Sequence, residues 1–212
     1  MSILFTLLLL LSFSFAEEDW KLVSVKDGIT STRKNIKDSP LFAFRGEADV
    51  EDSLGSLSAV LLKDEIGPEW VDLMNLSKIL RIEDSYTKVI HQGYDLPWPI
   101  QDRDYLMREV ASYDQESKVF TLKFESIEDP ILPKQSCCVR AKTYRTFWRL
   151  SVDPTTNKTH IEVEVYTDPK GALPAWLINL IQKDWPYNTI SGLLKRSRKG
   201  DLAKSPEAQT WN

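Results

Sequence analysis

The chain has 212 residues, of which 42% are hydrophobic and 27% charged, the proportions of one soluble globular domain. A domain of this length can bury a sizeable core and still enclose a cavity. The formal net charge of −4 does not favour nucleic acid as a partner, and two cysteines are too few for a disulfide framework.

Residues 1–16 have the features of a secretory signal peptide. Residues 3–13 form an apolar run, and Ser14-Phe15-Ala16 resembles a small-residue cleavage site. The run is too short to span a bilayer comfortably, so we expect cleavage after Ala16, with an uncleaved anchor as the alternative. We therefore expect an exported protein, periplasmic in a Gram-negative host and secreted otherwise. One domain should occupy residues 17–202, and a loose tail should occupy 203–212.

Alternation of polar and apolar residues predicts an antiparallel sheet through most of the chain. Residues 20–36 have the pattern of a hairpin that turns at Lys26-Asp27-Gly28, and residues 41–50 that of another strand. An amphipathic helix is expected at 53–63, followed after Gly67-Pro68 by a second short helical piece. Further strands are expected at 77–84, 87–94, 104–113, 118–126, 139–152 and 160–167.

One helical region should follow the sheet. Pro174 suits its first turn, where a missing N–H costs nothing, and Pro186 should kink or restart the helix. Apolar residues recur at helical spacing, namely Leu173, Trp176, Leu177, Leu180 and Ile181, then Ile190, Leu193 and Leu194. A many-stranded antiparallel sheet followed by a long amphipathic helix predicts an α+β layered fold. The pattern alone leaves open whether the space between sheet and helix is packed or hollow.

The sequence has no recognisable motif of a catalytic or metal centre. His91 and His160 have no carboxylate partner at motif spacing, and no Gly-x-Ser-x-Gly turn or phosphate-binding glycine loop occurs. The adjacent Cys137 and Cys138 are a poor zinc site without a nearby histidine, and adjacent cysteines rarely bridge, so free thiols are expected. We therefore expect no enzyme, no cofactor and no metal.

Two charged patterns have ordinary structural explanations. Glu162 and Glu164 share one face of a strand, and they should pair with Arg145 or Arg149 across the hairpin on a solvated face. The basic cluster at 195–199 suits a helix C-terminus, where the dipole favours cations. A membrane-docking patch is the alternative reading of that cluster.

The strand at 139–150 carries an unusual face. Alternation places Tyr144, Thr146 and Trp148 on the same side. Such a face fits either a core with aromatic fillers or the wall of a cavity that offers hydroxyl groups to a mostly apolar ligand.

Four segments, in order along the chain, resemble START (StAR-related lipid transfer) domains. They are Gly67-Pro68-Glu69-Trp70, Tyr94-Asp95-Leu96-Pro97-Trp98-Pro99 leading to Arg103-Asp104-Tyr105, Val139-Arg140-Ala141-Lys142-Thr143-Tyr144, and Asp168-Pro169-Lys170-Gly171-Ala172-Leu173-Pro174-Ala175-Trp176. The resemblance extends over residues 19–200. Within the family, the chain is similar to the stand-alone bacterial members. The resemblance implies a helix-grip fold, in which a curved antiparallel sheet wraps around a long C-terminal helix and encloses a hydrophobic cavity.

The same resemblance implies a monomer that binds a lipid or sterol non-covalently, for transfer or sensing, and that contacts a membrane surface transiently. Movement of the helix or of the 129–135 loop would admit the ligand. The ligand-contacting candidates are Gln92, Tyr94, Arg108, Tyr144, Thr146, Trp148, Trp176, Leu177 and Leu180. Phosphatidylcholine is disfavoured, because Gly67 and Gln92 occupy the positions of a phosphate-binding arginine and a choline-cage tryptophan. Arg103 and Asp104 are expected to fix the start of their strand.

Two other functions stay open. Helix-grip folds also host cyclases and hydrolases that act on hydrophobic small molecules, and a cavity-facing histidine or carboxylate with a shifted pKa would favour an enzyme. A solid core between sheet and helix would instead favour a ligand-free interaction module.

Overall fold

The computed structural model describes residues 20–202. The predicted signal peptide, the predicted tail and residues 17–19 of the predicted domain lie outside these residues. The strands are β1 (Lys21–Lys26), β2 (Ile29–Asn35), β3 (Phe42–Val50), β4 (Met74–Ile82), β5 (Thr87–Tyr94), β6 (Arg103–Asp114), β7 (Val119–Ser126), β8 (Val139–Arg140), β9 (Lys142–Val152) and β10 (Thr159–Asp168). The helices are α1 (Leu54–Leu61), the 3₁₀ helix η1 (Asp64–Glu69), α2 (Ala175–Gln182) and α3 (Trp185–Ser197). Within 20–202, no helix has both the length and the apolar character needed to cross a membrane.

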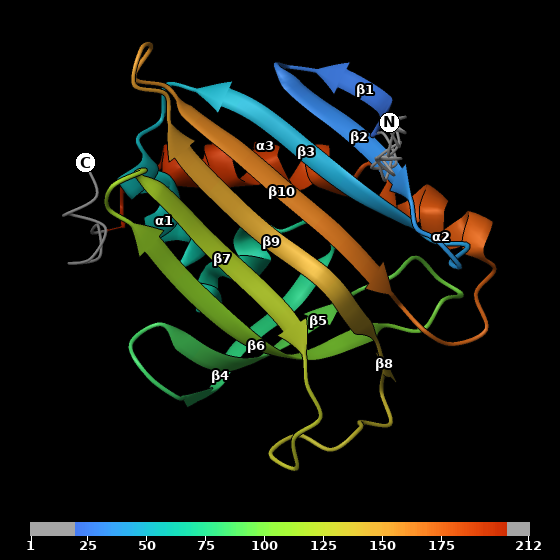
Figure 1. Cartoon of the computed structure of the whole chain (residues 1–212). Coiled ribbons are helices and arrows are strands. Elements are labelled where there is room, and N and C mark those ends of the chain that lie inside the picture. Colours follow the sequence, from blue (N-terminus) through green and yellow to red (C-terminus); the bar gives the residue numbers. More distant parts are fainter. Residues whose placement is uncertain (1–19, 203–212) are drawn as a thin grey trace, which may run out of the picture.

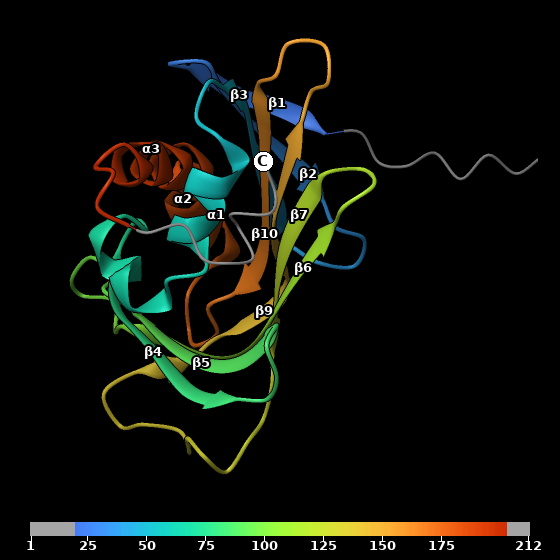
Figure 2. The ribbon, with the colours of Figure 1, turned by 90° about the vertical axis from the view of Figure 1, so that its left-hand side faces the viewer.

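The strands form one curved sheet in the order β1-β2-β3-β10-β9-β7-β6-β5-β4. Neighbours along this path are antiparallel, and the short β8 pairs in parallel with β6. The last strand returns to the first half of the chain, since Thr159 of β10 lies opposite Val50 of β3. All three α-helices lie on one face of the sheet (Figure 2), and α3 runs behind β3 and β10 (Figure 1). The predicted α+β helix-grip architecture is therefore confirmed.

Two glycines allow close approach between α3 and its neighbours. A Cβ atom added at Gly46 of β3 would lie 2.8 Å from Cδ1 of Ile190, and one added at Gly192 would lie 2.0 Å from the main-chain oxygen of Trp70. Only glycine, which has no Cβ atom, allows a side chain at the first position and a main-chain carbonyl at the second to approach this closely. These positions therefore set how tightly α3 lies against the sheet and against the end of η1.

Apolar side chains fill the space between sheet and helices at the end nearest α1. Fully buried residues of this core include Leu57, Phe120, Leu150, Ile161, Ile190 and Leu193. They come from α1, β7, β9, β10 and α3, so this end of the layer is a conventional packed core. The other end of this space, between the sheet and α2, is not filled in this way.

Two expected elements are divided. The C-terminal helical region breaks between Gln182 and Trp185, with Asp184 as the cap of α3 and Pro186 in its first turn, as proline predicts. The long strand expected at 139–152 is interrupted at Ala141, because Val139 leaves the antiparallel ladder and pairs in parallel with Arg103.

The outer face of β10 carries two buried acids. The side chains of Glu162 and Glu164 are each only 2% exposed. Arg45 lies 3.2 Å from the first and 2.9 Å from the second, Arg145 lies 2.5 Å from Glu164, and Arg149 pairs with Glu162. The predicted ion pairs are confirmed. The expectation of a solvated face is wrong at these positions, because the arginine side chains cover the carboxylates.

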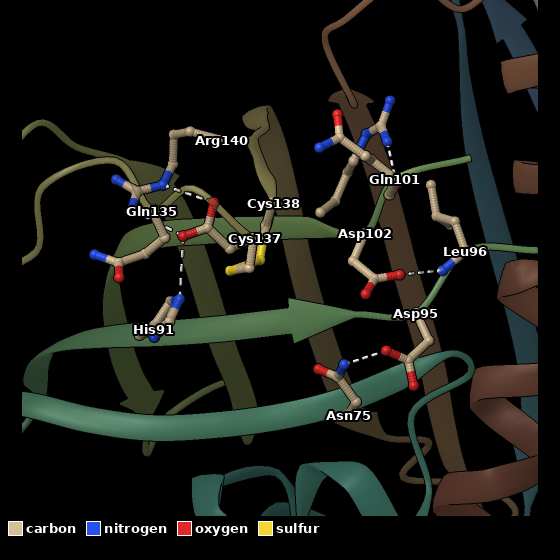
Figure 3. Close-up of a disulfide and its surroundings, with 12 residues drawn as sticks. Asn75, His91, Asp95, Leu96, Gln101, Asp102, Gln135, Cys137, Cys138 and Arg140 are labelled. Carbon is tan, nitrogen blue, oxygen red and sulfur yellow. Dashed lines mark hydrogen bonds and ion pairs between the residues drawn. A yellow bond between two sulfur atoms is a disulfide. The ribbon is translucent and has the colours of Figure 1, made fainter. Parts of the chain in front are cut away.

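Cys137 and Cys138 form a disulfide, so the expectation of free thiols is wrong (Figure 3). Their Cα atoms lie 3.8 Å apart, below the usual range of about 4.4–6.8 Å. The pair lies in the loop between β7 and β8, where no strand ladder constrains the backbone. Beside this loop, Asp104 accepts a hydrogen bond of 2.8 Å from Arg140 and lies 3.1 Å from Nε2 of His91. His91 thus has a carboxylate partner that sequence spacing did not reveal.

Candidate functional site

A cavity lies between the sheet and the two C-terminal helices. The volume that the centre of a water molecule can occupy inside it is about 140 Å³. A site for a single water needs roughly 10–15 Å³ of such volume. Its apolar lining includes Leu61, Trp70, Met74, Met107, Leu122, Phe124, Trp148, Val165, Ile178, Ile181 and Trp185. The interior at this end is therefore hollow, unlike the solid core expected of a ligand-free interaction module.

Four of the predicted ligand-contacting residues line this cavity. They are Gln92 and Tyr94 of β5, and Thr146 and Trp148 of β9. The hydroxyl of Tyr94 donates a 3.0 Å hydrogen bond to Oε1 of Gln92, and Trp148 meets Trp70 edge to face with ring centroids 5.8 Å apart. Burial raises the pKa of Tyr94, so its phenol stays protonated at neutral pH. These residues therefore form a wall that combines apolar surface with uncharged hydrogen-bonding groups.

Two predicted strand residues lie outside the cavity. The side chain of Arg108 is 43% exposed and donates a 2.9 Å hydrogen bond to Glu83, because its strand neighbour Met107 faces inward. Tyr144 is 45% exposed and stacks on Tyr166 at 5.0 Å. A break in the register of β9 and β10 leaves Tyr144 without a partner residue, which reverses the alternation at that point. As a consequence Thr143 lines the cavity, although the unbroken pattern placed it on the opposite face of the strand.

The three predicted helix residues do not line the cavity either. Trp176 is 68% and Leu180 is 49% exposed, and Leu177 is half-buried outside the lining. The inward face of the helices carries instead Ile178, Ile181, Gln182, Trp185 and Thr189. The helix α2 is apolar on nearly every side, so spacing could not choose its inward face.

The side chain of Asn179 sets the rotation of α2. Its Oδ1 accepts a 3.0 Å hydrogen bond from the main-chain N–H of Phe42, and its Nδ2 donates a 3.1 Å bond to the carbonyl of Pro40. A polar residue within an apolar helix was a signal in the sequence that could have indicated which side meets the sheet.

The loop that enters α2 is held by a buried arginine. Arg103, 3% exposed, donates to the main-chain carbonyls of Pro169 (2.9 Å), Lys170 (3.0 Å) and Gln101. Gly171, with φ of +78°, lets the loop turn against the guanidinium. Arg103 therefore connects the start of β6 to the start of the helix that covers the cavity.

A charged cluster lies at the end of the cavity nearest α1. Asp64 of η1 lines the cavity, and Nζ of Lys88 lies 2.6 Å from its carboxylate and 3.4 Å from that of Glu109. Burial, and then the nearby Asp64, raise the pKa of Glu109 well above its ordinary value against the opposing effect of Lys88. The pKa of Lys88 is also raised, because the two carboxylates outweigh the effect of burial. Sequence reasoning missed this cluster, since its members lie far apart in the chain.

His91, the candidate for an enzymatic role, does not line the cavity. Its neighbour Gln92 faces inward, whereas His91 lies on the outer face of β5 against Asp104 (Figure 3). Burial lowers the pKa of His91 despite the nearby carboxylate. Among the described residues, no cluster of histidine, cysteine and acidic side chains could hold a metal ion.

Comparison with known proteins gives consistent matches. Residues 7–199 match the START domain family. The chain is 25% identical to an uncharacterized protein of Pseudomonas aeruginosa, over 86% of this chain and 88% of that protein. It is also 25% identical to the phosphatidylcholine transfer protein of Bos taurus, over 83% of each chain.

Solved structures agree on the fold. A fragment of a STAR-related lipid transfer protein from Xanthomonas axonopodis superposes with a TM-score of 0.75 at 24% identity, over 84% of this chain and 98% of that one. Human StAR-related lipid transfer protein 5 superposes with a TM-score of 0.75 at 18% identity, over 85% and 87% of the two chains.

Proposed function

The chain belongs to the START domain family, and from this premise we propose that it binds a lipid non-covalently in its cavity and carries it between membranes. The observation that supports this proposal is the hollow, largely apolar interior beneath α2 and α3. Burial of a lipid there would remove several hundred square ångströms of apolar surface from water, at about 25 cal/mol per Å². The lipid transfer proteins among its relatives support the same role.

Access to the cavity would involve α2 and the loop between β5 and β6. Leu96 of that loop and Ile178 of α2 both line the cavity. On the outer side of the same segments, Trp98 is 92% and Trp176 68% exposed. Exposed tryptophans suit the boundary between water and lipid headgroups. We propose that this surface touches the membrane while α2 moves aside. The 129–135 loop, the alternative considered from the sequence, does not line the cavity.

The basic cluster at the end of α3 does not suit membrane docking. Arg196 is 4% exposed and bonds Asp201 and Glu69, while Arg198 bonds Asp52 at 2.8 Å. These acids neutralise the cations locally, so the cluster presents little net positive charge to an anionic surface.

We propose a carrier without a chemical step. An enzyme would need a reactive group in the cavity. The acids of the lining are Asp64, which is held by Lys88, and Asp72, which accepts a hydrogen bond from Asn188. His91 lies outside the lining. Incubation of the protein with each lipid that it binds should return that lipid with unchanged mass, and a product in the lipid extract would support the alternative of a cyclase or hydrolase.

We further propose that the protein is exported and acts as a monomer, in the periplasm of a Gram-negative host or outside the cell otherwise. The apolar segment at 1–16 supports export. The bond between Cys137 and Cys138 is compatible with an oxidising compartment. N-terminal sequencing of the protein from its host would test whether the chain begins at residue 17.

The central experiment is transfer of a fluorescent lipid between two vesicle populations. A cavity-filling variant, Val165→Trp, should abolish transfer, because Val165 is 7% exposed and points into the cavity. Tyr166→Trp is the matched control, since it places the same indole one residue along β10, where Tyr166 stacks on Tyr144 outside the cavity. Both variants should first be checked for a cooperative unfolding transition. Equal transfer by both folded variants would contradict the proposal.

A further inference from the structure

The cavity contains buried polar atoms that have no partner in the protein. Among the described residues, such atoms on neutral side chains include Nε1 of Trp70, Oγ of Ser77, Oε1 of Gln182 and Oγ1 of Thr189, and all four residues line the cavity. Thr189 is 0% and Ser77 is 9% exposed. Buried polar groups are nearly always hydrogen-bonded, so four unpaired ones in the wall of one cavity indicate that a ligand supplies their partners.

The chemistry of these atoms limits the ligand. The indole N–H of Trp70 can only donate, Oε1 of Gln182 can only accept while its amide nitrogen donates 2.9 Å to Thr167, and the two hydroxyls can do either. A ligand that satisfies both kinds must offer an oxygen acceptor and an O–H or N–H donor. A single hydroxyl group provides both.

The charges of the lining limit the ligand further. Of the two cations among the lining residues, Lys63 is exposed, and Arg103 directs its guanidinium to three main-chain carbonyls. Of the two acids, Asp64 is paired with Lys88, and Asp72 accepts a 3.0 Å hydrogen bond from Asn188. The free cation, Lys63, is thus on the solvent-exposed side, and an ionised phosphate buried away from it would meet no uncommitted cation. Burial of an unpaired charge is very costly.

We propose that the cavity selects an uncharged lipid with a free hydroxyl group and excludes phospholipids, whose phosphate stays ionised. This inference rests on the proposed lipid binding and adds the class of ligand. The hydroxyl contacts the side chains of Thr189, Ser77 and Trp70, and the hydrocarbon occupies the apolar remainder of the cavity.

Binding should be measured by native mass spectrometry of the delipidated protein against lipids with identical acyl chains. The set is 1,2-dioleoylglycerol, its 3-O-methyl ether and dioleoylphosphatidylcholine, with cholesterol and its methyl ether as a second hydroxyl pair. We expect at least one free alcohol to bind tenfold or more tightly than its methyl ether and than the phospholipid. Phosphatidylcholine bound as tightly as the better-bound alcohol, or a methyl ether bound as tightly as that alcohol, would overturn this inference and leave lipid binding intact. No adduct with any lipid would overturn both.

Single substitutions test the assigned contacts. Thr189→Val and Ser77→Ala remove the hydroxyls at nearly constant volume, and each should weaken binding of the preferred alcohol by about threefold to tenfold, the value of one neutral hydrogen bond. Thr32→Val and Ser31→Ala are matched controls, because both hydroxyls are also buried and unpartnered but do not line the cavity. Binding of the methyl ether should change little in any variant. Equal losses in the cavity and control variants would overturn the assignment.

Discussion

Replacement of Lys88 by Met tests the charged cluster at the end of the cavity. In the native protein, Nζ of Lys88 donates to Asp64 at 2.6 Å and to the carbonyl of Leu62 at 3.1 Å, and it lies 3.4 Å from Glu109. The two carboxylic side chains are 3% and 1% exposed. Methionine preserves the apolar stem, so the substitution chiefly removes the positive charge between two buried acids.

We expect the Lys88→Met variant to lose about 3–5 kcal/mol of unfolding free energy near pH 8, the usual cost of a buried charge that has lost its partner. The loss should shrink as the pH is lowered. In the folded state the pKa of Glu109 lies above that of the unfolded chain, so the native protein binds the extra proton and stability falls as pH rises from 4.5 through the folded-state pKa. Without Lys88 the pKa of Glu109 rises further, so the pH range over which stability falls extends to higher pH.

Urea unfolding at pH 5 and at pH 8, followed by tryptophan fluorescence, measures both effects. Lys123→Met provides the control, since Lys123 is an exposed lysine on a neighbouring part of the sheet. A loss below about 1 kcal/mol at pH 8 would refute the reasoning, because it falls in the range of an exposed ion pair. An equal loss at the two pH values would refute the assignment of the raised pKa.

Three further predictions concern other parts of the molecule. The double variant Trp176→Ser with Leu180→Ser should slow lipid transfer between vesicles several-fold and change stability by no more than about 0.5 kcal/mol, because both side chains are exposed. Gly192→Ala should destabilise the protein by about 1–3 kcal/mol in urea unfolding, since the added Cβ would lie 2.0 Å from a main-chain oxygen. Iodoacetamide should label Cys137 and Cys138 only after reduction, which mass spectrometry would detect.

Two of these predictions have matched control variants. Ile82→Ser with Tyr86→Ser, also exposed but at the β4–β5 turn, should leave transfer at the native rate, and an equal slowing would contradict docking by α2. Ser191→Ala on α3 should be neutral, and similar stability of the two alanine variants would show that the helix can move away from η1. Alkylation of the unreduced protein would contradict the disulfide.

Much of the fold could be predicted because the signals are local. Alternation identified the strands, Lys26-Asp27-Gly28 identified the first turn, and Pro186 marked the break between the two C-terminal helices. Motif resemblance added the arrangement of these elements around a cavity. Gln92 and Thr146, two of the predicted ligand-contacting residues, line the cavity, and regular alternation holds at both positions.

The rest of the site depended on contacts between distant residues. The register break opposite Tyr166 turned Tyr144 outward, and Asn179 turned α2 so that Trp176 faces outward and Ile178 inward. A pattern with a period of two or 3.6 residues cannot reveal either event, since both arise from hydrogen bonds to other strands.

The sequence by itself determined the order and type of the elements, the helix-grip class and the absence of a recognisable catalytic motif. Tertiary structure alone decided which side chains face the cavity, that Lys88 lies between Asp64 and Glu109, and that four polar groups of the wall lack partners. The physical reason is that secondary structure follows from interactions between near neighbours, whereas a binding site is the sum of long-range packing that brings separate strands and helices together.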